Sequence, residues 1–392
     1  MPSAIDPEPG KGTPTGPVRV RARRAPGAPR APVSQPRAAL LRCWLVAAAA
    51  LPLAGCSAVP YYSQAISGEI ALLAAARPVE DWIADPATPA ELRQRLELAV
   101  RIRRFASQDL ALPDNRSYTR YADLHRSSAV WNVFATPELS LELQTWCYPV
   151  FGCAAYRGYF AQADAQQLAT ELRAQGSDAA VTPVPAFSTL GWLSDPLLST
   201  FLRWPEPELA RLIFHELAHQ VVYVRDDTRF NESFASAVER AGLARWVAQR
   251  DDPALREQYR QYEMHHQGLL ALVGQARAQL QALYGSGQPE ARRRSGKQAI
   301  FEDLGARYRV VRDTQWGGYA GYDAFFQAPW NNARVAALAA YQDDVPAFEA
   351  LLAQEQGQMP RFFDAVRRLA ALPAAQRASA LQALAPVPGS GA

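Results

Sequence analysis

The sequence lacks the positive charge that a nucleic-acid-binding protein needs. Its 392 residues carry a formal charge of +3, but the first 55 hold eight basic residues against Asp6 and Glu8. The remainder therefore has 33 basic and 36 acidic residues, a formal charge of about −3. We expect no nucleic-acid partner. After Cys56 the chain also lacks any apolar run of roughly 18 residues, so this part predicts no membrane-spanning helix.

Cysteine is scarce as well. Of four cysteines, only Cys147 and Cys153 lie in the body of the chain, where they frame the loop YPVFG. In an oxidising compartment such a loop can close as a disulfide, and two reduced, buried thiols are the alternative. No other Cys or His lies near them in sequence, which makes them poor candidates for metal ligands.

The N-terminal segment predicts export. Arginines up to Arg42 precede the apolar run CWLVAAAALPLAG, which is too short for a permanent spanning helix. The tetrapeptide LAGC at residues 53–56 resembles the bacterial lipobox. This resemblance implies a signal peptide over residues 1–55, a lipid group on Cys56 and, with Ser57 following, sorting to the outer membrane. We therefore expect a lipid-anchored, periplasm-facing envelope protein; an ordinary signal peptide with an incidental cysteine is the alternative.

The hydrophobic pattern predicts a mainly α protein with a small β-sheet, of the α+β class. Residues 56–113 are expected to form an N-terminal helical segment. It has one helix over SGEIALLAAARPVEDWIAD and a second that begins with a capping box at Thr88. Residues 114–200 predict the small sheet, with AVWNVFAT, GYF and AFSTLGW as strand candidates. The last run, at residues 186–192, is either an edge strand that pairs with substrate or an interior strand.

Residues 114–392 are expected to form one catalytic region in which helices return after the sheet. The basic run at residues 292–294 is expected in a solvated loop, and Asn331 is expected to cap a helix. Helices are predicted at 206–224, 231–248, 253–283, 297–312, 331–341, 345–355 and 359–371, followed by a flexible tail over 373–392.

The stretch HELAHQ at residues 215–220 is the most specific motif. On a helix, His215 and His219 share one face, so both imidazoles can reach a single ion. Glu216 lies beside that site, where it can act on water as a general base. The rest of this helix is apolar, which implies burial, and buried imidazole and carboxylate groups need a partner such as zinc. Two core histidines that bond to carbonyl groups are the alternative.

A catalytic zinc site needs a third protein ligand. The run NESFA at residues 231–235 begins the next apolar helix, and antiparallel packing would bring Glu232 beside the histidines. Glu239, seven residues further, is the reserve ligand or a partner of a ligand. Two roles stay open. The candidates for a tyrosine that stabilises the oxyanion are Tyr223, expected on the histidine helix, Tyr319 and Tyr322. The candidates for a carboxylate that binds a substrate amine are Asp195, Glu206, Glu208, Asp226 and Asp227.

These motifs resemble those of the gluzincin metallopeptidases, since HELAH followed by NESFA is similar to the HExxH and NExFA elements of zinc aminopeptidases. The resemblance implies His215, His219 and Glu232 as zinc ligands and Glu216 as the general base. The gap between His219 and Glu232 is shorter than in those enzymes, so the connecting turn must be tighter. The chain after Cys56 resembles the bacterial lipoprotein family of predicted zinc aminopeptidases, which implies a zincin-like core with helical N- and C-terminal parts.

The sequence thus predicts a zinc metallopeptidase that hydrolyses peptide bonds in the cell envelope, and the resemblance makes it an aminopeptidase. A non-catalytic envelope scaffold with a structural or degenerate zinc site is the alternative, although such a site has no use for the base Glu216. A zinc hydrolase of another bond in cell-wall material is a third possibility. Nothing in the sequence indicates an oligomeric state.

Overall fold

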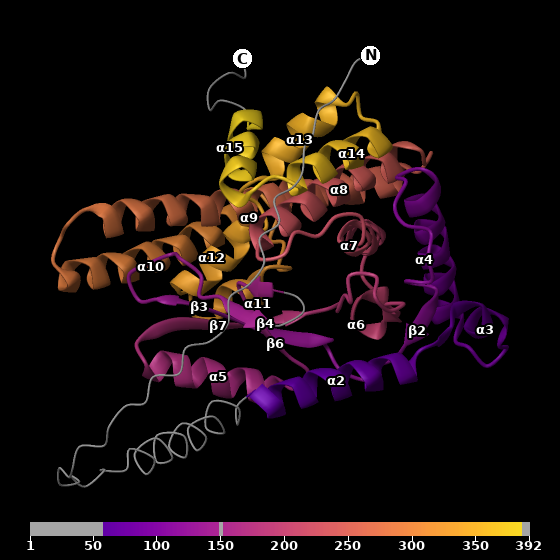
Figure 1. Cartoon of the computed structure of the whole chain (residues 1–392), viewed down its shortest axis with the longest axis horizontal. Helices are drawn as coiled ribbons and strands as arrows, with labels where there is room; N and C mark the ends of the chain where they lie inside the picture. The colour runs from indigo at the N-terminus through magenta and orange to yellow at the C-terminus, as the bar shows by residue number, and fades with distance from the viewer. Residues whose placement is uncertain (1–57, 149–151, 386–392) are drawn as a thin grey trace, which may run out of the picture. The chain divides into compact units, whose positions relative to one another are not determined.

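Helices predominate in the described part of the chain, residues 58–148 and 152–385, where the strands form three small sheets (Figure 1). This computed structural model therefore has the predicted mainly α architecture with small sheets. The chain divides after Ala58, and the residues from Val59 on form one compact unit. None of the described helices is long and apolar enough to cross a membrane. The predicted signal peptide and Cys56 lie outside the described residues.

The central sheet has the antiparallel order β6-β3-β7 and is covered on both faces. β3 (Val130–Pro137) pairs with β7 (Ser177–Val184) over its whole length and with β6 (Arg157–Tyr159). α5 (Gln162–Ala174) packs on one face and α12 (Asn332–Ala340) on the other, as Figure 1 shows. Because both faces of β3 are buried, the strand is apolar almost throughout instead of alternating.

Two smaller sheets complete the strands that the structure describes. β2 (Arg120–Ala122) lies between β1 (Arg77–Pro78) and β8 (Leu197–Leu198). β4 (Trp146–Tyr148) and β5 (Gly152–Ala154) form an antiparallel hairpin. In this hairpin Cys147 lies directly opposite Cys153, and the two form a disulfide.

The first predicted helix is interrupted. α2 (Ala58–Ala75) begins earlier than expected and ends before Pro78, and the short helix α3 (Val79–Ala84) follows. Pro78 has no N–H to continue a helix and disfavours helical backbone at the residue before it, so the chain is extended here and pairs with β2.

The capping box at Thr88 was also wrong. α4 (Ala90–Gln108) has Pro89 at its N-cap position and receives no side-chain hydrogen bond there. The Thr88 hydroxyl is buried and has no hydrogen-bond partner among the described residues. α4 itself is confirmed, because its apolar face, including Ile102 and Phe105, is buried as the helical spacing predicts.

The run AFSTLGW forms no strand, so neither the edge-strand nor the interior-strand interpretation holds. The Asp195 carboxylate instead accepts hydrogen bonds from the Thr189 amide (3.1 Å) and hydroxyl (2.7 Å), which curl residues 188–195 into a loop. Leu190 and Gly191 have φ of 56° and 82°, outside the β region. The other two strand candidates are confirmed as β3 and β6, whereas α5 lies in a region where only strands were expected.

From residue 199 on the described structure is helical, with three differences from the prediction. α7 is shorter than expected, the basic run at 292–294 lies inside α10, and the expected tail contains α15. The helices are α6 (Ser199–Leu202), α7 (Glu206–Ala218), α8 (Thr228–Ala248), α9 (Pro253–Gly285), α10 (Glu290–Thr314), α11 (Asp323–Gln327), α12, α13 (Val345–Gln354), α14 (Met359–Ala370) and α15 (Ala374–Leu384).

Ion pairs explain two of these differences. Arg294 pairs with Glu290, one turn earlier on α10, and with Glu138, both at 2.9 Å, so the basic run is held on a helix. In α15, Arg377 is only 5% exposed and pairs with Asp227 at 2.7 Å. The expected tail is therefore docked beside the start of α8.

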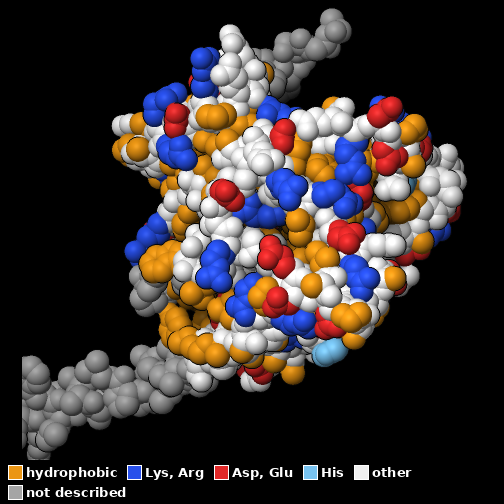
Figure 2. Space-filling view, turned by 90° about the vertical axis from the view of Figure 1, so that its right-hand side faces the viewer, with side chains coloured by type: hydrophobic (Ala, Val, Ile, Leu, Met, Phe, Trp, Pro, Cys, Tyr) orange, Lys and Arg blue, Asp and Glu red, His pale blue; other side chains and the backbone are white. Residues whose placement is uncertain are grey.

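The main core surrounds α7 and α8. Phe214 of α7 packs against α4 through Phe105, with ring centroids 5.8 Å apart, and Phe234 of α8 packs against Phe348 of α13, also at 5.8 Å. On the face drawn in Figure 2, basic and acidic side chains are interspersed. That face offers no large basic area.

We predict that Asn331, at the start of α12, stabilises the fold and that Thr88, just before α4, does not. Asn331 caps α12 by accepting from the Arg334 amide (3.1 Å) and donates to the Ala179 carbonyl (3.0 Å). Asn331→Ala should lower the free energy of unfolding by about 1–2 kcal/mol, whereas Thr88→Val should cost close to nothing because no bond is lost. Chemical denaturation of both variants measures this. An equal loss in Thr88→Val would show that its hydroxyl has a partner in solution.

Candidate metal centre

α7, the helix that carries the histidines, begins at the predicted residue but ends earlier than predicted. Pro205 is the N-cap residue of α7, with Pro207 and two glutamates in the first turn, where proline and acids are favoured. α7 ends at Ala218, six residues before the end predicted at residue 224. His219 is its C-cap residue but keeps a right-handed helical conformation (φ −58°), so it still lies on the same side as His215.

α8 packs antiparallel against α7, as predicted. At one end His219 lies beside Glu232, and at the other Glu206 accepts a hydrogen bond from the Trp246 indole at 2.9 Å. The C-terminal end of α7 therefore contacts the N-terminal part of α8, and the N-terminal end of α7 contacts the C-terminal part of α8. Glu232 lies in the second turn of α8 because that helix starts at Thr228, earlier than expected.

Three side chains of the two helices converge on one point. The Nε2 atoms of His215 and His219 are 3.2 Å apart, and the Glu232 carboxylate lies 3.3 Å from the first and 3.6 Å from the second. All three residues are buried, and their possible ligand atoms lie within 4.8 Å of one another. This group could bind a metal ion. The burial that the apolar helix predicted is also present, since both histidines are 8% exposed.

Asn231, the residue before Glu232, holds the connection between α7 and α8 in place. The Asn231 side chain accepts from the Val224 amide and donates to the Val224 carbonyl, both at 2.7 Å. Asp227 caps α8 by accepting from the Phe230 amide at 3.0 Å. The tight turn between His219 and Glu232 is therefore held by a closed pair of hydrogen bonds and a helix cap.

Glu239 supports the group without joining it. Its carboxylate lies 2.8 Å from His215 Nδ1 and 3.1–3.2 Å from Arg211 Nη1. Because an ionised carboxylate only accepts, His215 Nδ1 carries a proton and Nε2 faces Glu232 and His219. His219 Nδ1 has no such partner among the described residues. Glu239 thus fixes the ring of one histidine, the second of the two roles considered for it.

The electrostatics of the group favour positive charge at its centre. Burial disfavours a protonated His215, but Glu232 and Glu239 outweigh it and raise the pKa of His215 to about 10. Burial likewise disfavours ionised carboxylates, yet His219 beside Glu232 and Arg211 beside Glu239 hold both carboxyl pKa values at about 2. Glu239 has Arg211 as its cation, whereas Glu232 faces the two histidines, and a metal ion between the ligand atoms could supply positive charge there.

Glu216 lies beside the group but does not belong to it. Burial raises its pKa, while the adjacent His215 and His219 pull the pKa in the opposite direction. Within the described residues its carboxylate takes part in no hydrogen bond. It is therefore free to bond with a water molecule or a substrate.

The structure places Tyr223 differently from the prediction. Because α7 ends at Ala218, Tyr223 lies in the connection after the helix, where it is 40% exposed. It remains close enough to Glu232 for that carboxylate to add to the effect of burial in raising the tyrosine pKa.

Three other tyrosines border the group, and no local pattern in the sequence indicated them. Burial raises the pKa of Tyr156 and of Tyr341, and both Glu232 and Glu216 raise it further. Tyr156 packs against the cluster that contains Ala333 and Ala337 of α12, and Tyr341 is the C-cap residue of that helix. The Tyr341 ring also stacks against His215, with centroids 6.4 Å apart. Tyr118 is 2% exposed, with φ of 63°, and its hydroxyl has no hydrogen-bond partner among the described residues although Glu216 is near.

The other residues considered for the oxyanion and for the substrate amine have partners outside the metal-binding group. Tyr319 stacks on His265 at 3.8 Å, and Tyr322 packs edge-on against Tyr319, so both belong to the packing between α9 and α10. The acids considered for amine binding mostly have protein partners. Glu206 pairs with Arg250, Asp227 with Arg377 and Asp226 with the Cys153 amide, Asp195 holds its own loop, and Glu208 lies near Arg211.

A model of a known protein family matches almost the whole described chain. The model of the family described as "Putative aminopeptidase" matches residues 60–381, a range that includes α7, α8 and every residue of the metal-binding group. No curated protein and no solved structure matches the chain. Since the family model spans well over half of its length, the chain belongs to the putative aminopeptidase family.

Proposed function

We propose that this protein is a zinc-dependent metallopeptidase of the bacterial cell envelope, and an aminopeptidase as its family description says. The observation that carries the proposal is the convergence of His215, His219 and Glu232 with a carboxylate, Glu216, left beside them. His₂Glu is a donor set of catalytic zinc sites, and an adjacent glutamate that is not a ligand suits a general base.

The geometry of the three ligands supports zinc. Nitrogen and oxygen ligands lie about 2.0–2.1 Å from a tetrahedral zinc ion, so two of them are roughly 3.3 Å apart. The three separations in the group are 3.2, 3.3 and 3.6 Å. Glu239, bonded to the opposite nitrogen of His215, completes the carboxylate–histidine arrangement that is common at zinc.

The chain's own residues account for proton transfer. When bound, zinc would polarise the scissile carbonyl and lower the pKa of a water. Glu216 accepts a proton from the attacking water and returns it to the leaving amine. The raised pKa of Glu216 suits a group that must first take and then release a proton.

A tyrosine hydroxyl near Glu232 donates to the carbonyl oxygen as negative charge develops on it. Tyr156 packs against α12, whose C-cap residue Tyr341 stacks on His215, whereas Tyr223 is 40% exposed in the connection after α7. The donor should lie near both the metal ligands and the base. We therefore assign this role to Tyr156 in preference to Tyr223, one of the three candidates from the sequence, with Tyr341 stacked on His215 as a positioning residue.

The envelope location rests on the N-terminal sequence. Residues 1–55 are proposed to be a signal peptide and Cys56 the lipidated N-terminus of the mature protein, anchored in the outer membrane and facing the periplasm. The Cys147–Cys153 disulfide suits an oxidising compartment. Peptides of the envelope are the proposed substrates.

A structural metal site in a scaffold protein is the competing function. Structural zinc sites are usually closed by four protein ligands, whereas the group found among the described residues has three. An open position next to an available carboxylate favours catalysis.

The first prediction separates metal binding from proton transfer. His219→Ala and Glu232→Ala should reduce bound zinc from one ion per chain to almost none, because each removes a ligand. Glu216→Gln should keep the zinc but lower kcat by roughly 10²–10⁴, since only the proton acceptor is lost. Elemental analysis and cleavage of aminoacyl and internally quenched peptides measure both. Zinc loss in Glu216→Gln would instead make Glu216 a ligand.

The second prediction concerns the support of His215. Glu239→Gln weakens the hydrogen bond that orients the ring, so zinc affinity should fall by about 10–100-fold. Competition with a chelator measures the affinity. Glu208→Gln is a matched control, because Glu208 is also near Arg211 but has no bond to a ligand. An equal loss in the two variants would contradict a specific role for Glu239.

The third prediction ranks the tyrosines. Tyr156→Phe should lower kcat by about 10²–10³ through loss of one donor, with little change in bound zinc. Tyr223→Phe should lower kcat much less. Steady-state kinetics on the same peptides tests the order, and a larger loss in Tyr223→Phe would instead assign the role to Tyr223.

A further inference from the structure

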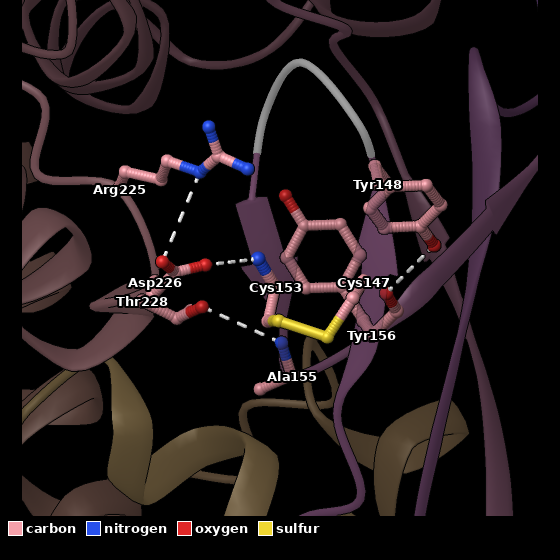
Figure 3. Close-up of a disulfide and its surroundings, with 8 residues drawn as sticks. All are labelled: Cys147, Tyr148, Cys153, Ala155, Tyr156, Arg225, Asp226 and Thr228. Carbon is pink, nitrogen blue, oxygen red and sulfur yellow. Dashed lines mark hydrogen bonds and ion pairs between the residues drawn. A yellow bond between two sulfur atoms is a disulfide. The ribbon is translucent and has the colours of Figure 1, made fainter. Parts of the chain in front are cut away.

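The disulfide hairpin lies directly on the connection between the two metal-binding helices. Figure 3 shows that the Asp226 carboxylate accepts from the Cys153 amide and that the Ala155 amide donates to the Thr228 hydroxyl at 3.4 Å. Asp226 belongs to the connection and Thr228 is the first residue of α8. Both contacts are therefore made where the connection enters α8, four and six residues before Glu232.

Gly152 shows how closely the hairpin approaches. This residue has φ of 81°, and a Cβ atom on it would lie 2.4 Å from the side chains of both Arg225 and Asp226. Only glycine allows β5 to lie so near the connection. The hairpin backbone is thus pressed against the connection that precedes α8.

Tyr156 follows the hairpin and packs against α12, whose C-cap residue Tyr341 stacks on His215 of the metal-binding group. Figure 3 shows it beside the disulfide, and its backbone carbonyl accepts from the Tyr148 hydroxyl of β4 at 3.4 Å. Tyr148 in turn accepts from Tyr61 of α2 at 3.3 Å. The position of Tyr156 therefore depends on both strands of the hairpin, and the disulfide is the covalent link between those strands.

Given the proposed function, we propose that the Cys147–Cys153 disulfide is a positioning element of the active site. It locks the hairpin against the α7–α8 connection and holds the Tyr156 hydroxyl at the metal centre. Its reduction lowers turnover without releasing the metal. The ligands themselves come from helices that are fixed by their own core, so the metal does not depend on the hairpin.

Reduction requires an external dithiol. Two electrons and two protons pass to the S–S bond, which becomes two thiols, and the dithiol closes its own disulfide. An oxidant of the disulfide class reverses the exchange. Activity of the protein then follows the thiol–disulfide balance of its surroundings.

The test compares the full-length wild type with Cys147→Ser/Cys153→Ser, Tyr156→Phe and the combined triple variant. We expect the double cysteine variant to retain one zinc and a wild-type circular dichroism spectrum but to lose roughly 10–100-fold in kcat, with a smaller change in KM, because the hydroxyl is misplaced. The triple variant should be no slower than Tyr156→Phe, because the disulfide acts through that hydroxyl.

Reduction of the wild type provides a measurement that does not depend on how the variants fold. A dithiol should lower its kcat to the level of the double cysteine variant, and reoxidation should restore it. The double cysteine variant should not respond and so controls for chelation by the reductant.

Four results would overturn the proposal: a double cysteine variant as active as wild type, wild type insensitive to reduction, zinc lost with the disulfide, or losses that multiply in the triple variant. A zinc-loaded wild type that cleaves no peptide would instead refute the proposed function and this inference with it.

Discussion

The antiparallel packing of α7 against α8 is the constraint on which the rest of the structure depends. It pairs His219 with Glu232 at one end and Glu206 with Trp246 at the other, so the ligand atoms meet only if the helices keep this register. The turn between them is short, and Asn231 and Asp227 close it with hydrogen bonds. The surrounding core, with Phe214 against α4 and Phe234 against α13, fixes the two helices as a unit.

This packing places charge where charge is costly. Glu232 and Glu239 are 8% and 3% exposed, and each would be strongly disfavoured in its ionised form without a positive neighbour. Arg211 forms an ion pair with Glu239, and the space between Glu232 and the two histidines suits a cation. A buried carboxylate at that point makes the site selective for positive charge, while Glu216 stays available beside it. Stability and chemistry are thus coupled, because the same burial that strengthens the core favours a cation beside Glu232.

The parts of the structure that depend on local sequence could be predicted, and the parts that depend on distant contacts could not. The group of His215, His219 and Glu232 follows from helical spacing and the packing of adjacent helices. The strand β3 and most C-terminal helices follow from apolar periodicity. Tyr156 and Tyr341 come from distant segments with no motif, and α15 is held by Arg377 through a partner 150 residues away. The run at 186–192 forms a loop in place of the predicted strand because hydrogen bonds to Asp195, and not the aromatic residues, decide its conformation.

The measurement that tests the central claim most directly is a crystal structure of the purified protein with anomalous diffraction recorded at the zinc absorption edge. The account predicts a single strong peak about 2.0–2.2 Å from His215 Nε2, His219 Nε2 and a Glu232 carboxylate oxygen, with Glu216 beside it and unligated. A site without metal after zinc is supplied, or a metal bound through Glu239 or Glu216 in place of Glu232, would contradict it.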